Sequence, residues 1–327
     1  MKILITGGAG FLGTQLARAL VARGTLCGER ITALTLTDIA GAVAPDLAGN
    51  SLVRFVRGSL VHRLGEALSN TPDAVFHLAS AVSGECEADF DLGLSSNLDA
   101  TRALLDALRA QFARTGQAPL FFFSSSVAVF GSDPALPLAP VVRDETLPTP
   151  QSSYGIHKFI CEQLVADYTR KGYVDGRVAR LMTVSVRPGR PNGAASSFLS
   201  GIVREPLAGV EAICPVDPST EVALASPATT IAGILAVAEA SREAFGGRTA
   251  LNLPALTVTV GGMIEALSQV AGAEVAARVR VAPDPAISRI VGGWPARFEC
   301  RRTASLGLKA DQSYADVIRQ YMAMNGG

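Results

Sequence analysis

The sequence is poor in the residues that build metal sites and disulfide frameworks. Its five cysteines are spread along the chain, at positions 27, 86, 161, 214 and 300, and its three histidines are far apart. No Cys-x-x-Cys or His-x-x-His spacing occurs, although such spacings are the usual sequence signs of structural zinc. We therefore expect neither a disulfide framework nor a metal.

Net charge and long apolar runs are also absent. The chain carries 29 basic and 29 acidic residues, so no basic excess favours a nucleic-acid partner. No apolar run reaches the roughly 18 residues of a membrane span. The first residues, MKILITGGAG, lack the long apolar core of a signal peptide. We expect a soluble cytoplasmic protein that binds neither nucleic acid nor membrane.

The first half of the chain alternates strand-like and helix-like segments. Short β-rich runs predict strands over residues 2–6, 31–38, 52–58, 74–80 and 119–126. Helical spacing predicts helices over residues 11–24 and 97–112. This succession is typical of an α/β protein with a Rossmann-like, doubly wound parallel sheet. Runs that are apolar on both faces, such as residues 120–123, fit its buried strands.

After residue 183 the pattern becomes less regular, and proline and glycine are frequent. A strand over residues 177–186 and helices over 229–245 and 261–272 alternate with loops there. A chain of 327 residues suits one large domain with a smaller lobe. We expect residues 1–183 to form the sheet domain, to which later segments return, and residues 184–327 to form mainly a C-terminal substrate-binding lobe.

A glycine-rich loop, TGGAGFLG at residues 6–13, separates the first strand from the first helix. Its Gly8-x-Gly10-x-x-Gly13 spacing is that of a dinucleotide-binding loop, where glycines permit a tight turn, close approach to a pyrophosphate and packing of helix on strand. The helix N-terminus adds free N–H groups and the positive end of the helix dipole. An ordinary tight turn is the alternative. The flanking strand and helix favour a cofactor, with contacts at Gly7, Gly10, Phe11 and Leu12.

Asp38 ends the second predicted strand, 25 residues after Gly13. A carboxylate there accepts hydrogen bonds from the adenosine ribose of NAD and repels the 2′-phosphate of NADP. No arginine or lysine occurs in residues 38–46 to favour NADP. The expected cofactor is therefore NAD, bound by residues 1–183. The alternative is that Asp38 only forms a turn.

Tyr154 and Lys158 stand four residues apart at the start of an apolar-periodic run, so they share one helix face. A free tyrosine titrates near pH 10 and is a poor base at neutral pH. A neighbouring ammonium group and a bound nicotinamide cation are charges that lower such a pKa. The strand ending in FFFSSS brings a serine hydroxyl to the ligand-binding edge of the sheet. The pair alone is often a solvated helix face, but the whole set predicts a proton-transfer site.

Together these features resemble the extended short-chain dehydrogenases/reductases, the NAD-dependent epimerase/dehydratase family. The motifs TGGAGFLG, HLAS, NLDAT, FFFSSSVAVFG and YGIHK occur in the family's order over nearly the whole chain. The resemblance implies that Tyr154 is the general base, that Lys158 lowers its pKa and holds the nicotinamide ribose, and that Ser126 bonds the reacting oxygen. It also implies cofactor contacts at Ser59 (where the family often has aspartate), Leu60, Leu78, Ala79, Ser80, Asn97 and Leu181.

The substrate half departs from the sugar-nucleotide epimerases of the family. Thr183 stands where they usually have an asparagine that meets the sugar diphosphate, and Phe130 is the aromatic residue after the serines. Residues 186–209 resemble the D-erythronate dehydrogenases, NAD-dependent members that oxidise the C2 hydroxyl of a four-carbon sugar acid. Uronate dehydrogenases are nearer in chemistry than the epimerases are.

Polar residues of that segment are candidates for binding a small acid, because they supply hydrogen-bond donors and positive charge. The predicted substrate contacts are Asn192, Ser197 and Arg204 in this segment, with Ser196 beside them, and Ser80, Ser126, Tyr154 and Thr183 outside it. The alternative is that a serine here caps the following helix and that Arg204 is solvated. Arg187 and Arg190 are alternative carboxylate ligands that position alone does not rank.

Other polar residues near these motifs are not expected to be catalytic. His157 points off the face of Tyr154 and is expected to be exposed. His77 ends a buried strand, where a hydrogen-bonded core histidine is expected. Cys161 is expected to pack inside.

The resemblance favours a dehydrogenase in which a proton and a hydride leave C2 of a sugar acid. Two other functions stay open. One is an epimerase or dehydratase with tightly bound NAD and a large nucleotide-sugar pocket. The other is an NAD-sensing protein without turnover, which has little use for an intact Ser-Tyr-Lys set. The resemblance also implies a homodimer built from the helix at residues 101–112 and the helix that carries Tyr154.

Overall fold

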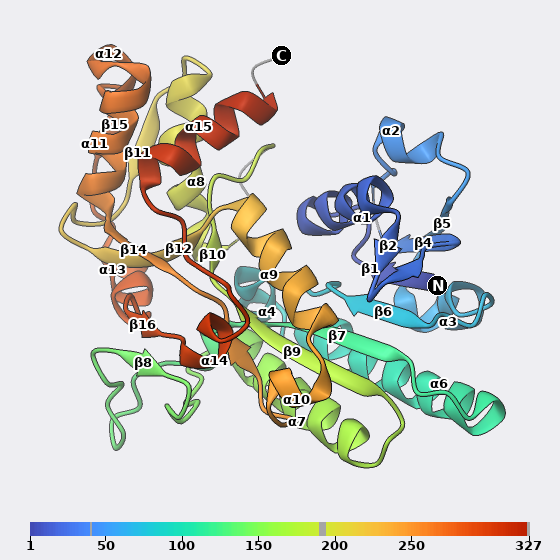
Figure 1. Ribbon diagram of the computed structural model, residues 1–327. Coiled ribbons are helices and arrows are strands. Elements are labelled where there is room, and N and C mark those ends of the chain that lie inside the picture. Colours follow the sequence, from blue (N-terminus) through green and yellow to red (C-terminus); the bar gives the residue numbers. More distant parts are fainter. Residues whose placement is uncertain (40, 190–193, 326–327) are drawn as a thin grey trace.

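The computed structural model of the protein describes residues 1–39, 41–189 and 194–325 (Figure 1). Its centre is a seven-stranded sheet in the order β13-β9-β7-β6-β1-β4-β5, with all neighbouring strands parallel. The strands are β1 (Lys2–Thr6), β4 (Ala33–Asp38), β5 (Val53–Arg57), β6 (Ala74–His77), β7 (Leu120–Ser126), β9 (Asp175–Leu181) and β13 (Leu251–Asn252). The predicted α/β fold with a parallel sheet is confirmed.

Helices cover both faces of this sheet. On one face, α1 (Phe11–Arg23) and α9 (Pro227–Glu239) share a core cluster with β1, β4 and β6. On the other face, α3 (Leu60–Ala67), α6 (Ala100–Thr115) and α7 (Ser153–Arg170) form a second cluster with β6, β7 and β9. Phe122 of β7 belongs to the first cluster, whereas Phe121 and Phe123 belong to the second. This alternation is what a strand covered on both faces requires.

The C-terminal half contains a second group of strands and helices (Figure 1) and a core cluster of its own. Its strands are β10 (Thr183–Val184), β12 (Glu221–Ala225) and β14 (Leu256–Thr259) in one sheet, and β11 (Ala212–Cys214) and β15 (Val279–Val281) in another. Its helices are α8 (Phe198–Leu207), α11 (Val260–Ala271), α12 (Ala273–Ala276), α13 (Pro285–Gly292) and α15 (Tyr314–Asn325). Between these segments the chain returns to the main sheet through α9, α10 (Arg242–Phe245) and β13. A domain boundary at residue 183 stays a prediction.

The remaining elements are short. They are β2 (Thr25–Leu26), β3 (Glu29–Arg30), α2 (Pro45–Ala48), α4 (Ser83–Ala88), α5 (Phe90–Gly93), η1 (Leu94–Asp99), η2 (Val127–Val129), β8 (Val142–Arg143), η3 (Ala195–Ser197), β16 (Phe298–Glu299) and α14 (Arg301–Ala304). Among the described residues, none of the helices has the length and apolar character needed to cross a membrane.

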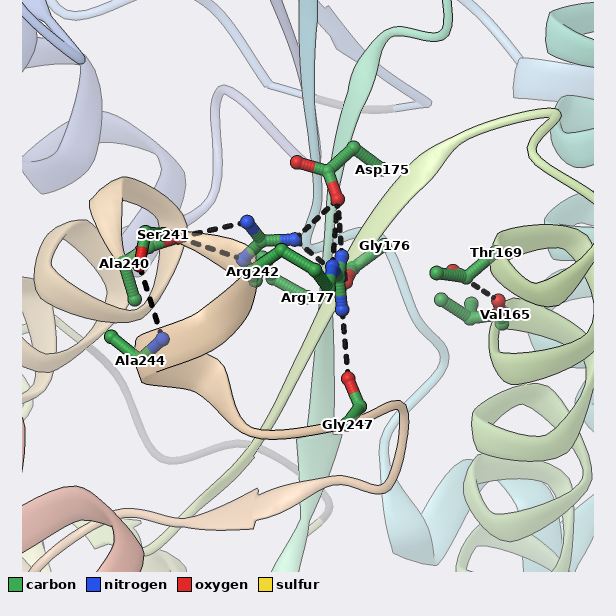
Figure 2. Close-up of polar contacts among 10 residues, drawn as sticks. All are labelled: Val165, Thr169, Asp175, Gly176, Arg177, Ala240, Ser241, Arg242, Ala244 and Gly247. Atoms are coloured by element: carbon green, nitrogen blue, oxygen red, sulfur yellow. Dashed lines mark hydrogen bonds and ion pairs between the residues drawn. The ribbon is translucent and has the colours of Figure 1, made fainter.

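The prediction of a single helix over residues 229–245 is wrong, because the chain breaks at Ala240 into α9 and α10 (Figure 2). The hydroxyl of Ser241 accepts the N–H of Ala244 at 3.0 Å and so caps α10. The Ala240 carbonyl accepts two hydrogen bonds from the guanidinium of Arg177, at 3.2 and 2.8 Å. A serine in a helix-like pattern thus starts a new helix.

Figure 2 also shows how this break is joined to the start of β9. The Asp175 carboxylate accepts a hydrogen bond from Arg177 at 2.6 Å and another from Arg242. Arg177, Arg242 and Arg302 lie over the ring of Phe245, at 5.3, 5.4 and 5.6 Å from its centre. Because β9 begins at Asp175, this cluster lies at the amino-terminal end of β9, whereas the candidate site lies at the carboxyl ends of the strands.

Candidate active site

The predicted motifs meet at the carboxyl edge of the main sheet. The chain builds β4 and β5 on one side of β1, and then β6, β7 and β9 on the other. Open α/β sheets bind ligands outside the strand ends at such a reversal of strand order. The glycine loop after β1, the segment after β6 and the serines at the end of β7 all lie there.

Two close backbone contacts explain why glycine is needed in the loop after β1. Gly7 has a left-handed φ of +70°, and a Cβ there would lie 2.9 Å from the nitrogen of Ala79. A Cβ on Gly13 would lie 2.0 Å from the carbonyl oxygen of Gly7. Glycine is therefore required at both positions for the first turn of α1 to pack on the loop, and for the loop to pack against Leu78 and Ala79.

The N-terminus of α1 is open toward a ligand. Gly10 is the N-cap residue, no side chain caps the helix, and the first turn contains no acidic residue. The first N–H groups of a helix have no acceptor inside the helix, so those of Phe11 and Leu12 can bind an anion. With the positive end of the helix dipole, they suit the pyrophosphate of a dinucleotide.

Asp38 ends β4 beside the glycine loop. Its Oδ2 accepts the N–H of Ala9 at 3.1 Å. A Cβ on Gly10 would lie 4.0 Å from the same oxygen. The carboxylate is thus held next to the anion-binding turn. An acidic residue at the end of this strand suits the hydroxyls of an adenosine ribose. The glycine cradle, the uncapped helix and this carboxylate together fit NAD.

A buried chain of hydrogen bonds supports the segment after β6. The N–H of Ala79 donates to the Thr6 hydroxyl at 3.2 Å, and that hydroxyl also bonds Nδ1 of His77 at 2.6 Å. Nε2 of His77 bonds the Thr101 hydroxyl at 2.9 Å. Burial lowers the pKa of His77 to about 3, so the ring is neutral and joins β1 to α6. The expected core histidine is confirmed.

Asn97 lies in η1, a π-helical turn, and is buried. Its Oδ1 accepts the N–H of Ala81 at 2.7 Å and the hydroxyl of Ser80 at 3.0 Å. Its Nδ2 donates to the sulfur of Cys86 at 3.2 Å. Through these hydrogen bonds, Asn97 holds the loop that carries Ser80 in place.

Three further predicted cofactor residues lie at element ends. Ser59 is the half-buried N-cap residue of α3, and Leu60 after it belongs to the core cluster under that helix. Leu181 ends β9 opposite Ser126 in the strand register and is also buried. Both leucines serve the core, and a role of any of the three in cofactor binding stays a prediction.

The fold brings Tyr154 to Ser126 through one tight contact. The hydroxyl of Ser152 accepts the N–H of Gly155 at 3.1 Å and caps α7, so Tyr154 lies in the first turn. A Cβ on Gly155 would lie 2.1 Å from the carbonyl oxygen of Ala128. Glycine therefore lets α7 pack directly on the turn that follows Ser126, and the Tyr154 phenol faces that serine hydroxyl.

Lys158 lies one helical turn later and is buried. Its Nζ donates to the carbonyl of Ser124 at 2.9 Å and lies 5.5 Å from the centre of the Tyr154 ring. Nζ also lies 4.9 Å from the centre of the Phe123 ring. The predicted serine, tyrosine and lysine thus form one group, and their catalytic roles stay a prediction.

Burial has opposite effects on the two ionisable members of this group. It raises the pKa of the Tyr154 phenol, and the strongest opposing effects include the hydroxyls of Ser126 and Ser80 and the Arg187 guanidinium. It lowers the pKa of Lys158 to about 8. The side chains alone therefore leave the phenol protonated at neutral pH, and a phenolate needs further positive charge at the site.

The structure distinguishes two of the candidate arginines. Arg204 of α8 pairs with the Glu205 carboxylate at 2.6 Å and donates to the Arg187 carbonyl at 2.8 Å. Both branches of its guanidinium are thus engaged by the protein. Arg187 follows β10, and the two ionisable side chains that act on its pKa are the Tyr154 phenol and the Arg204 guanidinium. Burial lowers the pKa of Arg187, and no carboxylate of the described residues is among the effects that oppose it.

The other predicted substrate residues of this region lie in β10, in η3 or outside the described residues. Thr183 is half-buried in β10, and Ser196 and Ser197 are half-buried in η3, just before α8. Asn192 and Arg190 lie outside the described residues. Among the described candidates of this segment, Arg187 is the one whose charge interacts with the Tyr154 phenol.

The expectation that His157 is exposed is wrong. Its side chain is buried, its ring lies 6.3 Å from that of Phe90 in α5, and a Cβ on Gly93 would lie 3.1 Å from its Cε1. The short helix α5 packs on α7 at this point, and its pattern is too short to predict that contact. Cys161 is buried as expected.

Sequence reasoning missed one charged residue next to the site. Glu162 lies one helical turn after Lys158, on the inner side of α7, and forms a buried ion pair with Arg180 of β9. The available signal was a carboxylate one helical turn after Lys158, together with an arginine inside a buried strand.

Two known proteins with similar sequences over nearly their whole length are named D-erythronate dehydrogenase. The chain is 51% identical to the D-erythronate dehydrogenase of Cupriavidus necator over 98% of both chains. It is 40% identical to that of Haemophilus influenzae, over 98% of this chain and 99% of the relative. Among solved structures, the nucleoside-diphosphate-sugar epimerase from Agrobacterium tumefaciens matches with a TM-score of 0.93 at 41% identity, over 100% of this chain and 95% of the other.

The family assignment follows from a match over most of the chain. Residues 3–220 match the NAD dependent epimerase/dehydratase family, and the glycine loop, the α1 N-terminus and Asp38 fit its cofactor, NAD. The relatives agree with the predicted class of activity, an NAD-dependent dehydrogenase acting on a CH–OH group. The chain belongs to the NAD-dependent epimerase/dehydratase family.

Proposed function

We propose that the protein oxidises D-erythronate at C2 to 2-dehydro-D-erythronate, with NAD as cofactor. The observation that carries this proposal is the buried Tyr154–Lys158 pair beside the serines that end β7, with Nζ of Lys158 5.5 Å from the centre of the Tyr154 ring and bonded to the Ser124 carbonyl. A phenol next to a serine and a lysine suits proton abstraction from a hydroxyl, and the Arg187 guanidinium, whose charge acts on that phenol, suits a carboxylate. The two relatives named D-erythronate dehydrogenase support the four-carbon acid.

In this mechanism the side chains of the protein move one proton. Tyr154 as phenolate accepts the proton of the C2 hydroxyl, while the Ser126 hydroxyl donates a hydrogen bond to the same oxygen and orients it. Bound NAD supplies the acceptor for the C2 hydride and a positive charge beside the phenol. Lys158, with a pKa of about 8, is mostly protonated at neutral pH and adds a second positive charge. The products are the 2-keto acid, NADH and one proton.

Arg187 binds the substrate carboxylate in this proposal. A guanidinium offers two parallel N–H groups to a carboxylate and fixes its orientation. The carboxylate is bonded to C2 in a 2-hydroxy acid, so an arginine next to Tyr154 brings the C2 hydroxyl to the phenol. Arg204 contributes indirectly, since it holds the Arg187 carbonyl at 2.8 Å.

The direct test is a substrate panel. Purified protein is mixed with NAD and four- to six-carbon aldonates and uronates, and NADH is followed by its absorbance. We expect D-erythronate to give a kcat/KM well above that of the other acids. NAD binding without NADH production from any acid would contradict the proposal, and NADH production with any of them would exclude a cofactor sensor without turnover.

A nucleotide-sugar epimerase is the second candidate, because the matching solved structure at 41% identity bears that name. Such an enzyme keeps NAD bound through its cycle and needs room for a sugar diphosphate. NAD retained through purification, together with thermal stabilisation by a UDP-sugar and none by D-erythronate, is the result that would favour it.

We also propose that the protein is a homodimer. Ile156 and Ile160 of α7 are 44% and 39% exposed, and Phe90 of the adjoining α5 is 60% exposed. An apolar helix surface of this kind suits a second copy of the chain. Sedimentation should give about twice the chain mass of 33.9 kDa, and the double change Ile156→Glu/Ile160→Glu should give monomers. A wild-type monomer at micromolar concentration would contradict this assembly.

A further inference from the structure

A bidentate ion pair lies inside the main sheet domain, close to Ser126. Nε and Nη2 of Arg180 donate to the two carboxylate oxygens of Glu162 at 2.8 and 2.7 Å. The side chains are 7% and 2% exposed. Burying two charges is costly, and apolar replacements of such pairs are often neutral or stabilising. Stability alone is thus a weak reason for the pair, and its contacts indicate another.

The pair touches the chain on both sides of Ser126. The hydroxyl of Ser125, just before it, donates to Oε1 of Glu162 at 2.5 Å. The guanidinium of Arg180 lies 4.8 Å from the centre of the ring of Phe130, which follows the short turn η2 after Ser126. The strand end and the exit of the turn are therefore both fixed to the same ion pair.

The same helix also holds the strand one residue earlier. Lys158 and Glu162 are one turn apart on α7, and Nζ of Lys158 donates to the carbonyl of Ser124 at 2.9 Å. On the side away from α7, Nη1 of Arg180 donates to Oδ1 of Asn252 in β13 at 3.3 Å. The pair thus joins β7, α7, β9 and β13 at the level of the three serines.

We propose that Glu162 and Arg180 are positioning residues, which hold the Ser126 hydroxyl in place beside Tyr154. This inference rests on the proposed function of Ser126 as the group that orients the reacting oxygen. Catalysis is sensitive to small displacements of such groups, and a shift of about 1 Å can cost roughly 100-fold in rate. The pair acts on the rate through Ser126 and has no contact with substrate in this scheme.

The test separates this role from a general contribution to folding. Ser125→Ala removes one hydrogen bond and leaves the Glu162–Arg180 pair intact, so the fold should persist. We expect its kcat to fall about 10-fold, with the KM for NAD unchanged. Glu162→Gln is the stronger variant and also leaves Arg180 without a counter-charge, so its thermal unfolding is measured beside its kinetics. Tyr168→Phe, which removes a 2.7 Å hydrogen bond to Asp106 farther along α7, is the matched control and should retain full kcat.

A double-mutant cycle identifies the path of the effect. Ser126→Ala should lower kcat by roughly 100-fold or more. If the pair acts through Ser126, adding Ser125→Ala to Ser126→Ala should cost almost nothing further in kcat. A full 10-fold loss in that background would overturn the positioning role, because the effect would then bypass Ser126.

The single variants distinguish failure of this inference from failure of the proposed function. An unchanged kcat in Ser125→Ala, with the expected loss in Ser126→Ala, would overturn the positioning role alone. An unchanged kcat in Ser126→Ala would overturn the proposed mechanism, and the positioning role with it.

Discussion

At the scale of single residues, Tyr154 is the group whose chemistry depends most on its surroundings. Burial raises the pKa of its phenol, so its use as a base requires the positive charges that the site gathers. Tyr154→Phe removes the proton acceptor and keeps the ring. We expect kcat to fall by roughly 10²–10⁴-fold while the dissociation constant for NAD, measured by calorimetry, stays within about twofold. A Tyr154→Phe enzyme with wild-type turnover would contradict the assignment.

Arg187 is the residue that should decide preference for an acid. Arg187→Ala removes a charge-assisted pair with the carboxylate, which is worth about 1.5–3 kcal/mol, or roughly 10- to 100-fold in kcat/KM for D-erythronate. Arg319→Ala, at an exposed arginine of α15, is the matched control and should change nothing. Equal losses in Arg187→Ala and the control, or no loss in either, would remove Arg187 from the substrate site.

Site residues that belong to a short sequence motif could be predicted from the sequence. The spacing of Gly7, Gly10 and Gly13 and the single turn between Tyr154 and Lys158 are readable along the chain. The choice between Arg187 and Arg204 was not readable along the chain. Consecutive residues of a helix do not normally face each other, so the sequence did not show that Arg204 pairs with Glu205 and also donates to the Arg187 carbonyl.

At the scale of elements, β6 depends on a neutral histidine. His77 links Thr6 to Thr101, and its pKa is lowered from 6.5 to about 3. The unfolded chain therefore binds a proton that the folded chain does not between these values, so stability is complete above pH 6.5 and is lost as pH falls. The expected loss from this residue is about 2 kcal/mol between pH 6.5 and about pH 4.5.

Urea unfolding over that pH range measures the effect of His77. His77→Gln should be less stable than the wild type at pH 7 and should lose less stability on acidification. His62→Gln, at an exposed histidine, should keep the wild-type pH dependence. If His77→Gln and the wild type lose stability in parallel, another group is responsible for the acid sensitivity.

The long strands were predictable because burial on two faces leaves a continuous apolar run, as in the phenylalanines of β7. Short elements were not. The break at Ala240 depends on Ser241 acting as a cap and on Arg177 receiving the freed carbonyl, and β13 is a strand only because Leu251 and Asn252 pair with β9. Such assignments come from tertiary contacts that local propensity does not contain.

At the scale of the whole molecule, the site combines the two core regions. Tyr154 comes from a helix of the main sheet, whereas Arg187 follows β10 of the small sheet. The chain returns to the main sheet through α9, α10 and β13 between segments of the C-terminal region. This interleaving fixes the base and the proposed carboxylate ligand in one folded unit.

The central claim is that the hydride leaves C2 of D-erythronate, and isotope transfer tests it most directly. D-erythronate carrying deuterium at C2 is oxidised with NAD, and the reduced cofactor is analysed by mass spectrometry. The account predicts NADH that carries one deuterium and a product that has lost it. Unlabelled NADH, with the deuterium still in the oxidised product, would show that a different carbon is attacked and would contradict the account.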